Sequence, residues 1–407
     1  MSVGRGKVLV LGHDTRMLIA ILRSLGRKKI EVHIAGCSAT SSALRSRFLT
    51  AVHHLPRFDP ASDDWLRKLT ALMDHEAYDL VIPATEFAVL SCQLHAEELA
   101  RHGKVYLLSP KLFDLVNDKA AIYEIAAREK IPVPTTVVFR KGKDTIEATH
   151  FRFPVFVKPS CSVSAHKGGL KDYAVRIEHA GELSNYVQSL LESHDQVLIQ
   201  DSVAGRGCGV ELLVHNGHIL FAFQHRRLHE STGFGSSYRE SVSLDPDLFE
   251  ASEKLVKALN YTGVVMIEFK VDEETGDWHF IEINARFWGS LPLAVAAGAD
   301  FPFSLYELLV NDKRDFEQRY RLGIRCRNLS ADIRWMRSSL RKKSADRWRG
   351  MDVNRISKWR LLADVGRIIF LRDRLDTFTV DDPRPAFYEM GRLIATAAQN
   401  LRRRLST

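Results

Sequence analysis

The pattern of apolar and polar positions in the first part of the chain alternates between short apolar runs and stretches with helical periodicity. It predicts strands at residues 7–11, 31–35, 80–84 and 104–108, and helices at 16–25, 65–75 and 87–101. Strands that alternate with helices form parallel sheets with right-handed crossovers. We therefore predict a parallel α/β domain over residues 1–112. Ligands of such sheets collect at the carboxyl ends of the strands, so residues 12–16 and 83–86 are either a substrate-binding edge or ordinary turns.

The pattern changes after two prolines, Pro132 and Pro134, which follow a helical stretch over residues 110–130 that is interrupted at Asn117 and Asp118. Beyond them the apolar runs are short and separated by turn signals. Strands are predicted at 153–159, 196–200, 210–214 and 218–225, the last two flanking the hairpin turn Asn216-Gly217. We predict an α+β domain with two lobes over residues 113–310.

One hairpin within this domain carries paired acidic residues. Residues 264–271 and 278–284 form strands joined by a polar turn, and a turn centred near Thr275 places Glu268 opposite Glu282. Like charges opposite each other destabilise a ladder, and a divalent cation between them would turn that cost into a binding site. The alternative is a solvated hairpin with surface carboxylates. Both strands are otherwise strongly apolar, which favours the metal site because unpaired buried charges are costly.

The residues that follow Glu282 extend this site. Side chains two apart on a strand share a face, so Asn284 and Arg286 point the same way as Glu282. Carboxylate and amide oxygens are ligands of Mg²⁺, which proteins usually bind together with substrate phosphates. The hairpin therefore predicts a nucleotide–metal site.

Composition limits the number of domains and the cellular compartment of the protein that carries this site. A chain of 407 residues is long enough for two or three domains. No apolar run approaches the roughly 20 residues that a membrane span needs, and no segment of signal-peptide type precedes residue 12. The five cysteines are scattered without metal-ligand spacing, which favours free thiols in a reducing compartment. We expect a cytoplasmic protein.

The charge is unevenly distributed along the chain. From Lys313 onward 24 Lys and Arg residues face 11 Asp and Glu residues, whereas the first 312 residues carry 34 against 39. This asymmetry predicts a separate, basic and mainly helical C-terminal module over residues 311–407. Its tryptophans lie among cations, as in proteins that contact anionic membrane surfaces or nucleic acid. A helical appendage packed on the body is the favoured reading, peripheral membrane contact is the second, and nucleic acid the least favoured.

The order of these elements over residues 7–310, together with the string 280–286, resembles ATP-grasp proteins of the carboxylate–amine ligase type. Residues 232–241 and 287–292 resemble an uncharacterised bacterial subgroup of predicted ligases. The resemblance implies a pre-ATP-grasp domain over residues 1–112 and an ATP-grasp domain over 113–310. Two departures stand out. The phosphate loop, residues 159–169, has glycines only at its far end, and Gln200 stands where many relatives carry Glu.

The resemblance also implies a role for individual residues. It assigns phosphate contacts to Lys119 and Lys158, and adenine contacts to Gln200 and Val203. Glu211 would place a carboxylate in the nucleotide cleft, and Arg286 would face the reacting group. The metal ligands would be Glu268, Glu282 and Asn284. Catalysis is assigned to Arg286 and Lys158. The implied cofactors are ATP and Mg²⁺, with Mn²⁺ as an alternative ion for the same ligands.

The implied reaction joins a small-molecule carboxylate to an amine through an acyl phosphate, giving ADP and phosphate. Two alternatives remain open: the same activation followed by attack of a thiol or another nucleophile, and an ATP-binding scaffold that has lost turnover through its altered loop. Arg226, Arg227 and Arg239 are candidates for holding the substrate carboxylate, or form a solvated basic face. Tyr238 is expected in the core.

Overall fold

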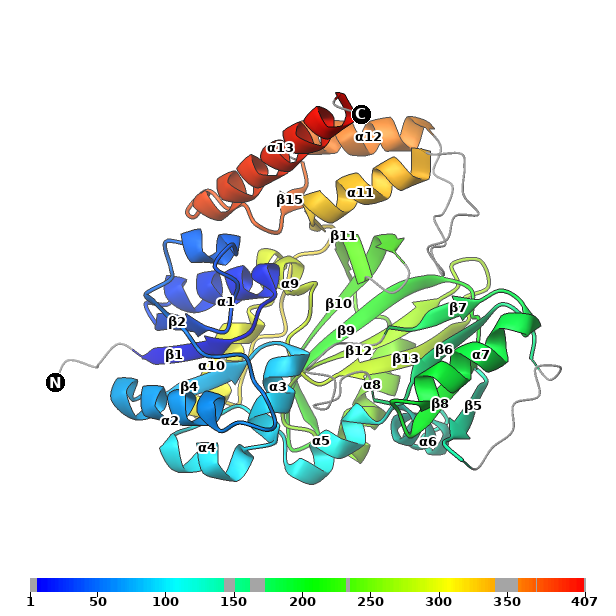
Figure 1. The fold of residues 1–407 in the computed structure, drawn as a ribbon, viewed down its shortest axis with the longest axis horizontal. Helices are drawn as coiled ribbons and strands as arrows, with labels where there is room; N and C mark the ends of the chain where they lie inside the picture. The colour runs from blue at the N-terminus through cyan, green and yellow to red at the C-terminus, as the bar shows by residue number, and fades with distance from the viewer. Residues whose placement is uncertain are drawn as a thin grey trace.

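The computed structural model describes residues 6–142, 151–161, 173–231, 235–340, 358–370 and 372–405. Most of the predicted phosphate loop, residues 162–169, and the stretch 232–234 lie outside the described residues. Within the described part, the strands form three sheets. Figure 1 shows the N-terminal sheet at one end, the two sheets of the middle region beside it, and three C-terminal helices above them.

The N-terminal sheet is parallel, with the order β3-β2-β1-β4. It is formed by β1 (Lys7–Leu11), β2 (Glu31–Ala35), β3 (Ala51–His53) and β4 (Leu80–Pro83). One face packs on α1 (Thr15–Arg27), α9 (Leu291–Ala297) and α10 (Phe301–Val310), and the other on α2 (Asp64–Glu76), α3 (Glu86–Gln93) and α4 (Ala96–His102). The predicted parallel α/β class is confirmed here.

Two predictions in this region were wrong in detail. The helix predicted over residues 87–101 is broken into α3 and α4. The strand predicted over 104–108 is reduced to an isolated bridge between Val105 and Val81. The three-residue strand β3 was not predicted, because so short a segment carries no periodic signal.

The middle region begins with α5 (Pro110–Asn117) and α6 (Lys119–Arg128), separated by Asp118 as predicted. The Asp118 carboxylate accepts hydrogen bonds from the backbone N–H groups of Ala120 and Ala121, which caps α6. A smaller antiparallel sheet follows, with the order β5-β8-β6-β7 and α7 (Ala180–Leu191) packed on it. Its strands are β5 (Thr136–Arg140), β6 (Val155–Pro159), β7 (Val175–Ile177) and β8 (Gln196–Asp201).

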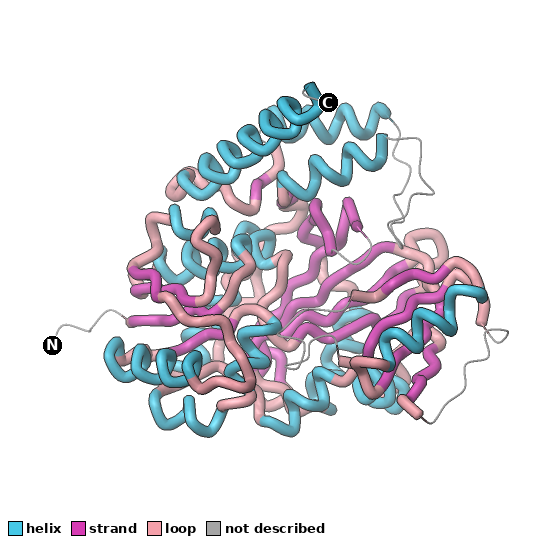
Figure 2. Tube along the Cα trace, in the orientation of Figure 1, coloured by secondary structure: helices cyan, strands magenta, loops and turns pink. Residues whose placement is uncertain are grey.

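The larger sheet has the order β13-β12-β9-β10-β11-β14-β15, and Figure 2 shows its long strands crossing the centre of the molecule. It comprises β9 (Arg206–His215), β10 (His218–Ser231), β11 (Gly235–Val242), β12 (Gly263–Val271), β13 (Trp278–Asn284), β14 (Arg325–Arg327) and β15 (Arg374–Leu375). One face carries apolar side chains that pack on α6 and α8 (Pro246–Ala258). The opposite face, near β12 and β13, carries the polar residues of the candidate site.

The C-terminal region is fastened to the rest of the chain through β14, β15 and several buried ion pairs. It also contains α11 (Leu329–Leu340), α12 (Lys358–Ile369) and α13 (Arg384–Leu405). Although the region is basic overall, its acidic side chains make these contacts: Asp382 pairs with Arg23 and Asp376 with Arg239. The boundary at residue 311 stays a prediction.

Among the described helices, none is by itself long and apolar enough to cross a membrane. The pair α9 and α10 passes the same test of length and composition together, with a bend of 87° between the two helices.

Candidate functional site

The acidic hairpin has the register that the sequence predicts. Glu268 of β12 pairs with Glu282 of β13, and Met266 pairs with Asn284. The amide Nδ2 of Asn284 donates to Oε1 of Glu268 at 3.3 Å and to Oε1 of Glu282 at 3.2 Å. The three side chains are half-buried. They bring two carboxylates and an amide side chain together. The amide nitrogen faces the carboxylates and Oδ1 faces Arg286, so a half-turn of the amide adds its oxygen to a donor set that fits Mg²⁺.

Arg227 of β10 holds a fixed positive charge beside these carboxylates. Its Nη2 lies 2.6 Å from Oε2 of Glu268. Burial acts to lower the pKa of Arg227, but the nearby carboxylates, Glu268 foremost, raise it overall. Gly207 makes room for this side chain, since a Cβ there would lie 2.6 Å from Cδ of Arg227. Nη2 of the Arg227 guanidinium is thus paired with a carboxylate of the site, and the expectation that Arg227 holds a substrate carboxylate stays a prediction.

Glu211 of β9 lies on the same face of the sheet but is fully buried. Its Oε1 is 2.5 Å from Nδ1 of His225, and its Oε2 has no hydrogen-bond partner among the described residues. Burial, reinforced by Glu268, raises the pKa of Glu211 well above its usual range. Burial also lowers the pKa of His225. Both shifts favour the neutral forms of this pair. The role of Glu211 as a carboxylate in the nucleotide cleft stays a prediction.

The two predicted lysines come from β6 and α6, outside the large sheet that carries the hairpin. Lys158, at the end of β6, is buried and donates from Nζ to the hydroxyl of Tyr123 at 2.8 Å. That hydroxyl donates to the carbonyl of Ile281 at 2.6 Å. Lys119, the first residue of α6, donates from Nζ to the carbonyl of Ser160 at 3.2 Å. Tyr123 was not predicted as a site residue, although it follows Lys119 by one helical turn and so lies on the same face of α6.

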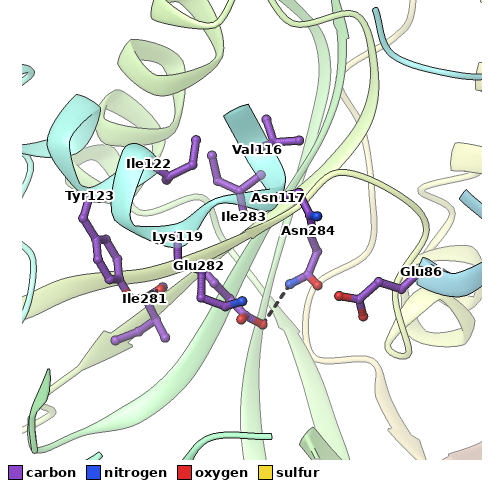
Figure 3. A pocket seen from close by; sticks show the side chains of 10 residues that line it. All are labelled: Glu86, Val116, Asn117, Lys119, Ile122, Tyr123, Ile281, Glu282, Ile283 and Asn284. Carbon is purple, nitrogen blue, oxygen red and sulfur yellow. Dashed lines mark hydrogen bonds between the residues drawn. The ribbon is translucent and has the colours of Figure 1, made fainter. Parts of the chain in front are cut away.

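A pocket joins these groups. Figure 3 shows Lys119 of α6 extending toward Glu282 of β13, Tyr123 lying beside Ile281, and Glu86 across from Asn284. A second hollow continues along the same wall to Arg286. The structure thus brings the predicted metal ligands, one phosphate lysine and the predicted arginine together.

Glu86, the first residue of α3, is supplied by the carboxyl edge of the N-terminal sheet. Its Oε2 lies 3.3 Å from Nη2 of Arg286, and the same nitrogen donates to Oδ1 of Asn284 at 3.0 Å. Nη1 of Arg286 donates to the carbonyl of Phe287 at 2.7 Å. The sequence placed residues 83–86 at a strand end where ligands collect, but it gave no signal that Glu86 orients an arginine of the site.

The other predicted residues lie away from the described lining of the two hollows. Gln200 is buried in β8, and its Nε2 donates to Oγ1 of Thr136 at 2.9 Å. The carbonyl of Val203, in the connection between the two sheets, accepts from Nζ of Lys270 at 3.3 Å. Arg226 pairs with Glu240 at 2.7 Å. Arg239 is buried against Asp376, so the expectation that it holds a substrate carboxylate is also corrected.

Comparison with known proteins agrees with this architecture. Residues 193–331 match a family model described as ATP-grasp in the biosynthetic pathway with Ter operon. The chain is 26% identical over 227 residues to a D-aspartate ligase of Enterococcus faecium, covering 51% of this chain and 53% of that protein. It is 22% identical over 334 residues to a D-alanine–D-alanine ligase of Rickettsia peacockii, covering 72% and 94%. The chain thus spans about half the length of the D-aspartate ligase that it matches.

Solved structures show the same fold. The L-amino acid ligase of Bacillus licheniformis superimposes with a TM-score of 0.56 at 16% identity, covering 75% of this chain and 74% of that one. The biotin carboxylase domain of 2-oxoglutarate carboxylase from Hydrogenobacter thermophilus, solved with MgADP, gives a TM-score of 0.61 at 17% identity, covering 78% and 73%. The chain therefore has the fold of ATP-grasp proteins, and its residues 193–331 match an ATP-grasp family model. Within that class, the part holding the acidic hairpin matches the Ter-operon biosynthetic family.

Proposed function

We propose that the protein is an ATP- and Mg²⁺-dependent ligase that activates a small-molecule carboxylate as an acyl phosphate and couples it to an amine. The observation that carries this proposal is the convergence of Glu268, Glu282 and Asn284 on one point, with Lys119 and Arg286 lining the two hollows beside it. Relatives named as D-aspartate ligase, D-alanine–D-alanine ligase and L-amino acid ligase support the reaction class.

Mg²⁺ would be held by the two carboxylates and the amide of the hairpin, where it would neutralise charge on phosphate oxygens. Lys119 and Lys158 are compact point charges suited to phosphate. Tyr123 fixes the ammonium of Lys158 through a 2.8 Å hydrogen bond. Arg286, oriented by Glu86, is placed to offset negative charge that develops on the reacting group.

The chemistry then needs no nucleophilic side chain. A substrate carboxylate oxygen bonds to the γ-phosphorus of ATP and ADP leaves with the electrons of the broken bond. The amine next bonds to the acyl carbon, phosphate leaves, and the amine loses a proton. Positioning and charge stabilisation dominate the catalysis of phosphoryl transfer, and these residues supply both.

The metal assignment is tested by Glu282→Ala, with Glu274→Ala in the exposed turn of the same hairpin as the matched control. We expect ADP release, measured across a panel of amino acids and small acids, to fall by two or more orders of magnitude in the first variant. The control should stay near the wild-type rate. Near wild-type turnover of Glu282→Ala at ordinary Mg²⁺ would remove the assignment.

The reaction type is tested by its products. We expect ADP and phosphate in equal amounts with ligated product, and we expect hydroxylamine to trap the activated acyl group as a hydroxamate. Stoichiometric AMP and pyrophosphate would exclude the acyl phosphate route. Trapping with hydroxylamine but no product with any amine would point to a thiol or another nucleophile. ATP binding without any turnover across the panel would favour the scaffold.

A further inference from the structure

A second cluster of metal-ligating side chains lies in the N-terminal domain, between the sheet and α2. His33 of β2, His53 of β3 and Glu76 at the end of α2 bring their ligand atoms within 4.8 Å of one another. His33 is buried and the other two are half-buried. The hydroxyl of Tyr78, two residues beyond α2, joins them. None of these residues takes part in the site described above.

The sheet register explains how the two histidines meet. His33 pairs with Ala51 and Ala35 pairs with His53, so both histidines project from the same face of neighbouring parallel strands. That face is the one covered by α2. Nδ1 of His33 and Nε2 of His53 lie 2.9 Å apart.

Several polar atoms converge on one ring nitrogen of His33. Nδ1 of His33 lies 2.9 Å from Nε2 of His53, 2.9 Å from the hydroxyl of Tyr78 and 3.9 Å from Oε2 of Glu76. A neutral imidazole nitrogen has either one proton or one lone pair in the ring plane, so it serves one partner at a time. The hydroxyl of Tyr78 and Nε2 of His53 therefore compete for Nδ1 of His33, while Glu76 at 3.9 Å lies beyond hydrogen-bond distance.

A cation placed among the donor atoms would satisfy all of them at once. Tetrahedral Zn²⁺ binds imidazole nitrogen and carboxylate oxygen at roughly 2.0–2.2 Å, which sets its ligand atoms about 3.3 Å apart. The distances of 2.9 Å and 3.9 Å from His33 bracket that value.

We propose that His33, His53 and Glu76 form a binding site for a divalent transition metal of the Zn²⁺ class, with the Tyr78 hydroxyl or a water as the fourth ligand. The site is separate from the oxygen-only Mg²⁺ site, and its two imidazoles select a softer ion. An ion here ties the short edge strand β3 to β2 and to the end of α2. The site does not depend on the ligase reaction.

Lys7 modulates this site. Its Nζ lies 3.0 Å from Oε2 of Glu76 and also donates to the backbone carbonyl of Glu76 at 3.0 Å. A carboxylate oxygen has a second lone pair, so Glu76 can accept the hydrogen bond from Lys7 and bind an ion at the same time. The ammonium orients the carboxylate but its charge opposes the ion. We therefore expect Lys7→Met to bind Zn²⁺ several-fold more tightly than the wild type.

The test uses the full-length protein, stripped with a chelator and titrated with Zn²⁺ in the presence of excess Mg²⁺. We expect one tight equivalent by calorimetry, a rise in melting temperature with Zn²⁺, and visible absorption bands when Co²⁺ is the probe. In His53→Ala the affinity for this Zn²⁺ equivalent should fall by more than ~100-fold, since even changes to groups that only orient the metal ligands lower affinity by about 10–100-fold. The matched control is His54→Ala, the exposed neighbour in sequence.

His33→Ala should lose the same equivalent, and circular dichroism without metal would check its fold. If His33→Ala does not fold, His53→Ala on the edge strand and Glu76→Gln still decide the question. Glu282→Ala should keep the Zn²⁺ equivalent, which separates this proposal from that for the ligase site. Equal Zn²⁺ affinity in His53→Ala and the wild type, or no Co²⁺ spectrum in the wild type, would overturn the site and leave only exposed histidines as ligands.

Discussion

Asp382 fastens the C-terminal region to the N-terminal domain, and Asp382→Ala tests how much that contact contributes. Its carboxylate is fully buried and accepts hydrogen bonds from Nε of Arg23 at 3.0 Å, the hydroxyl of Ser46 at 2.8 Å and the backbone N–H of Arg47 at 2.9 Å. The substitution would leave the buried guanidinium of Arg23 without its counter-charge.

The size of the effect follows from what remains around Arg23. Removing one partner of a buried ion pair costs about 3–5 kcal/mol, because it leaves an uncompensated charge. Arg23 would keep its hydrogen bonds to the backbone carbonyls of Thr377, at 2.8 Å, and of residue 382, at 2.7 Å. We therefore expect the lower end of that range, about 3 kcal/mol. At roughly 2–4 °C per kcal/mol for a large domain, the melting temperature should fall by about 6–12 °C.

The neighbouring residue offers a matched control. Asp381 pairs with Arg27 at 2.8 Å, but both side chains are more than a third exposed. An exposed pair contributes about 0.2–1 kcal/mol, so Asp381→Ala should shift the melting temperature by a few degrees at most. Thermal and urea unfolding of both variants, monitored by circular dichroism, would give the two values side by side.

Equal shifts for the two variants would refute the reasoning, because Asp382 is buried and accepts further hydrogen bonds from Ser46 and Arg47, whereas the Asp381 pair is exposed. A double variant, Arg23→Met with Asp382→Leu, should recover much of the loss, since replacing a buried pair with apolar groups is often neutral. An unfolding free energy of Asp382→Ala within about 1 kcal/mol of the wild type would mean that the C-terminal region is separable, as the charge switch at residue 313 predicts.

Three further outcomes are expected. Lys158→Met should lower turnover by roughly 10²-fold and raise KM for ATP, because it removes a charge aimed at phosphate; unchanged steady-state kinetics would exclude that role. Burial alone would lower the pKa of His229, but hydrogen bonds to two carboxylates raise it above its usual value. The stability that His229 contributes to the fold is therefore fully present below about pH 6.5 and is lost as pH rises through the folded-state pKa of His229. The difference in unfolding free energy between wild type and His229→Gln, measured in urea, should therefore be larger at pH 6 than at pH 8. Gly207→Ala should destabilise by about 1–3 kcal/mol because its Cβ would meet Arg227, whereas Gly181→Ala, with open space around it, should not.

Local patterns predicted the elements that form the site. The strands of the acidic hairpin adjoin along the chain, so the turn length fixes their register, and the pairing of Glu268 with Glu282 is confirmed. The break between α5 and α6 is confirmed for the same reason, since Asp118 caps the helix that follows it. In both cases the determining contacts lie within a few residues.

Contacts between distant segments could not be predicted in this way. Tyr123 meets Lys158 across 35 residues, and Arg227 meets Glu268 across 41. No periodicity reports such a pairing, because it depends on how whole sheets and helices pack. The strands β14 and β15 have three and two residues, too few to show alternation. Their place in the large sheet depends on pairing with neighbouring strands that are distant in sequence.

The ion pair between Arg23 and Asp382 has a consequence for the order in which the chain folds during synthesis. The partners are 359 residues apart, which corresponds to about 20–70 s of translation. Until Asp382 emerges, a nascent N-terminal domain has the apolar elements of its own sheet but leaves the Arg23 guanidinium without its carboxylate. The apolar side chains of α1 also lack α9 and α10 until residues 291–310 are made. The early domain therefore exposes an apolar face, and we expect it to depend on chaperone contact until the later segments cover that face.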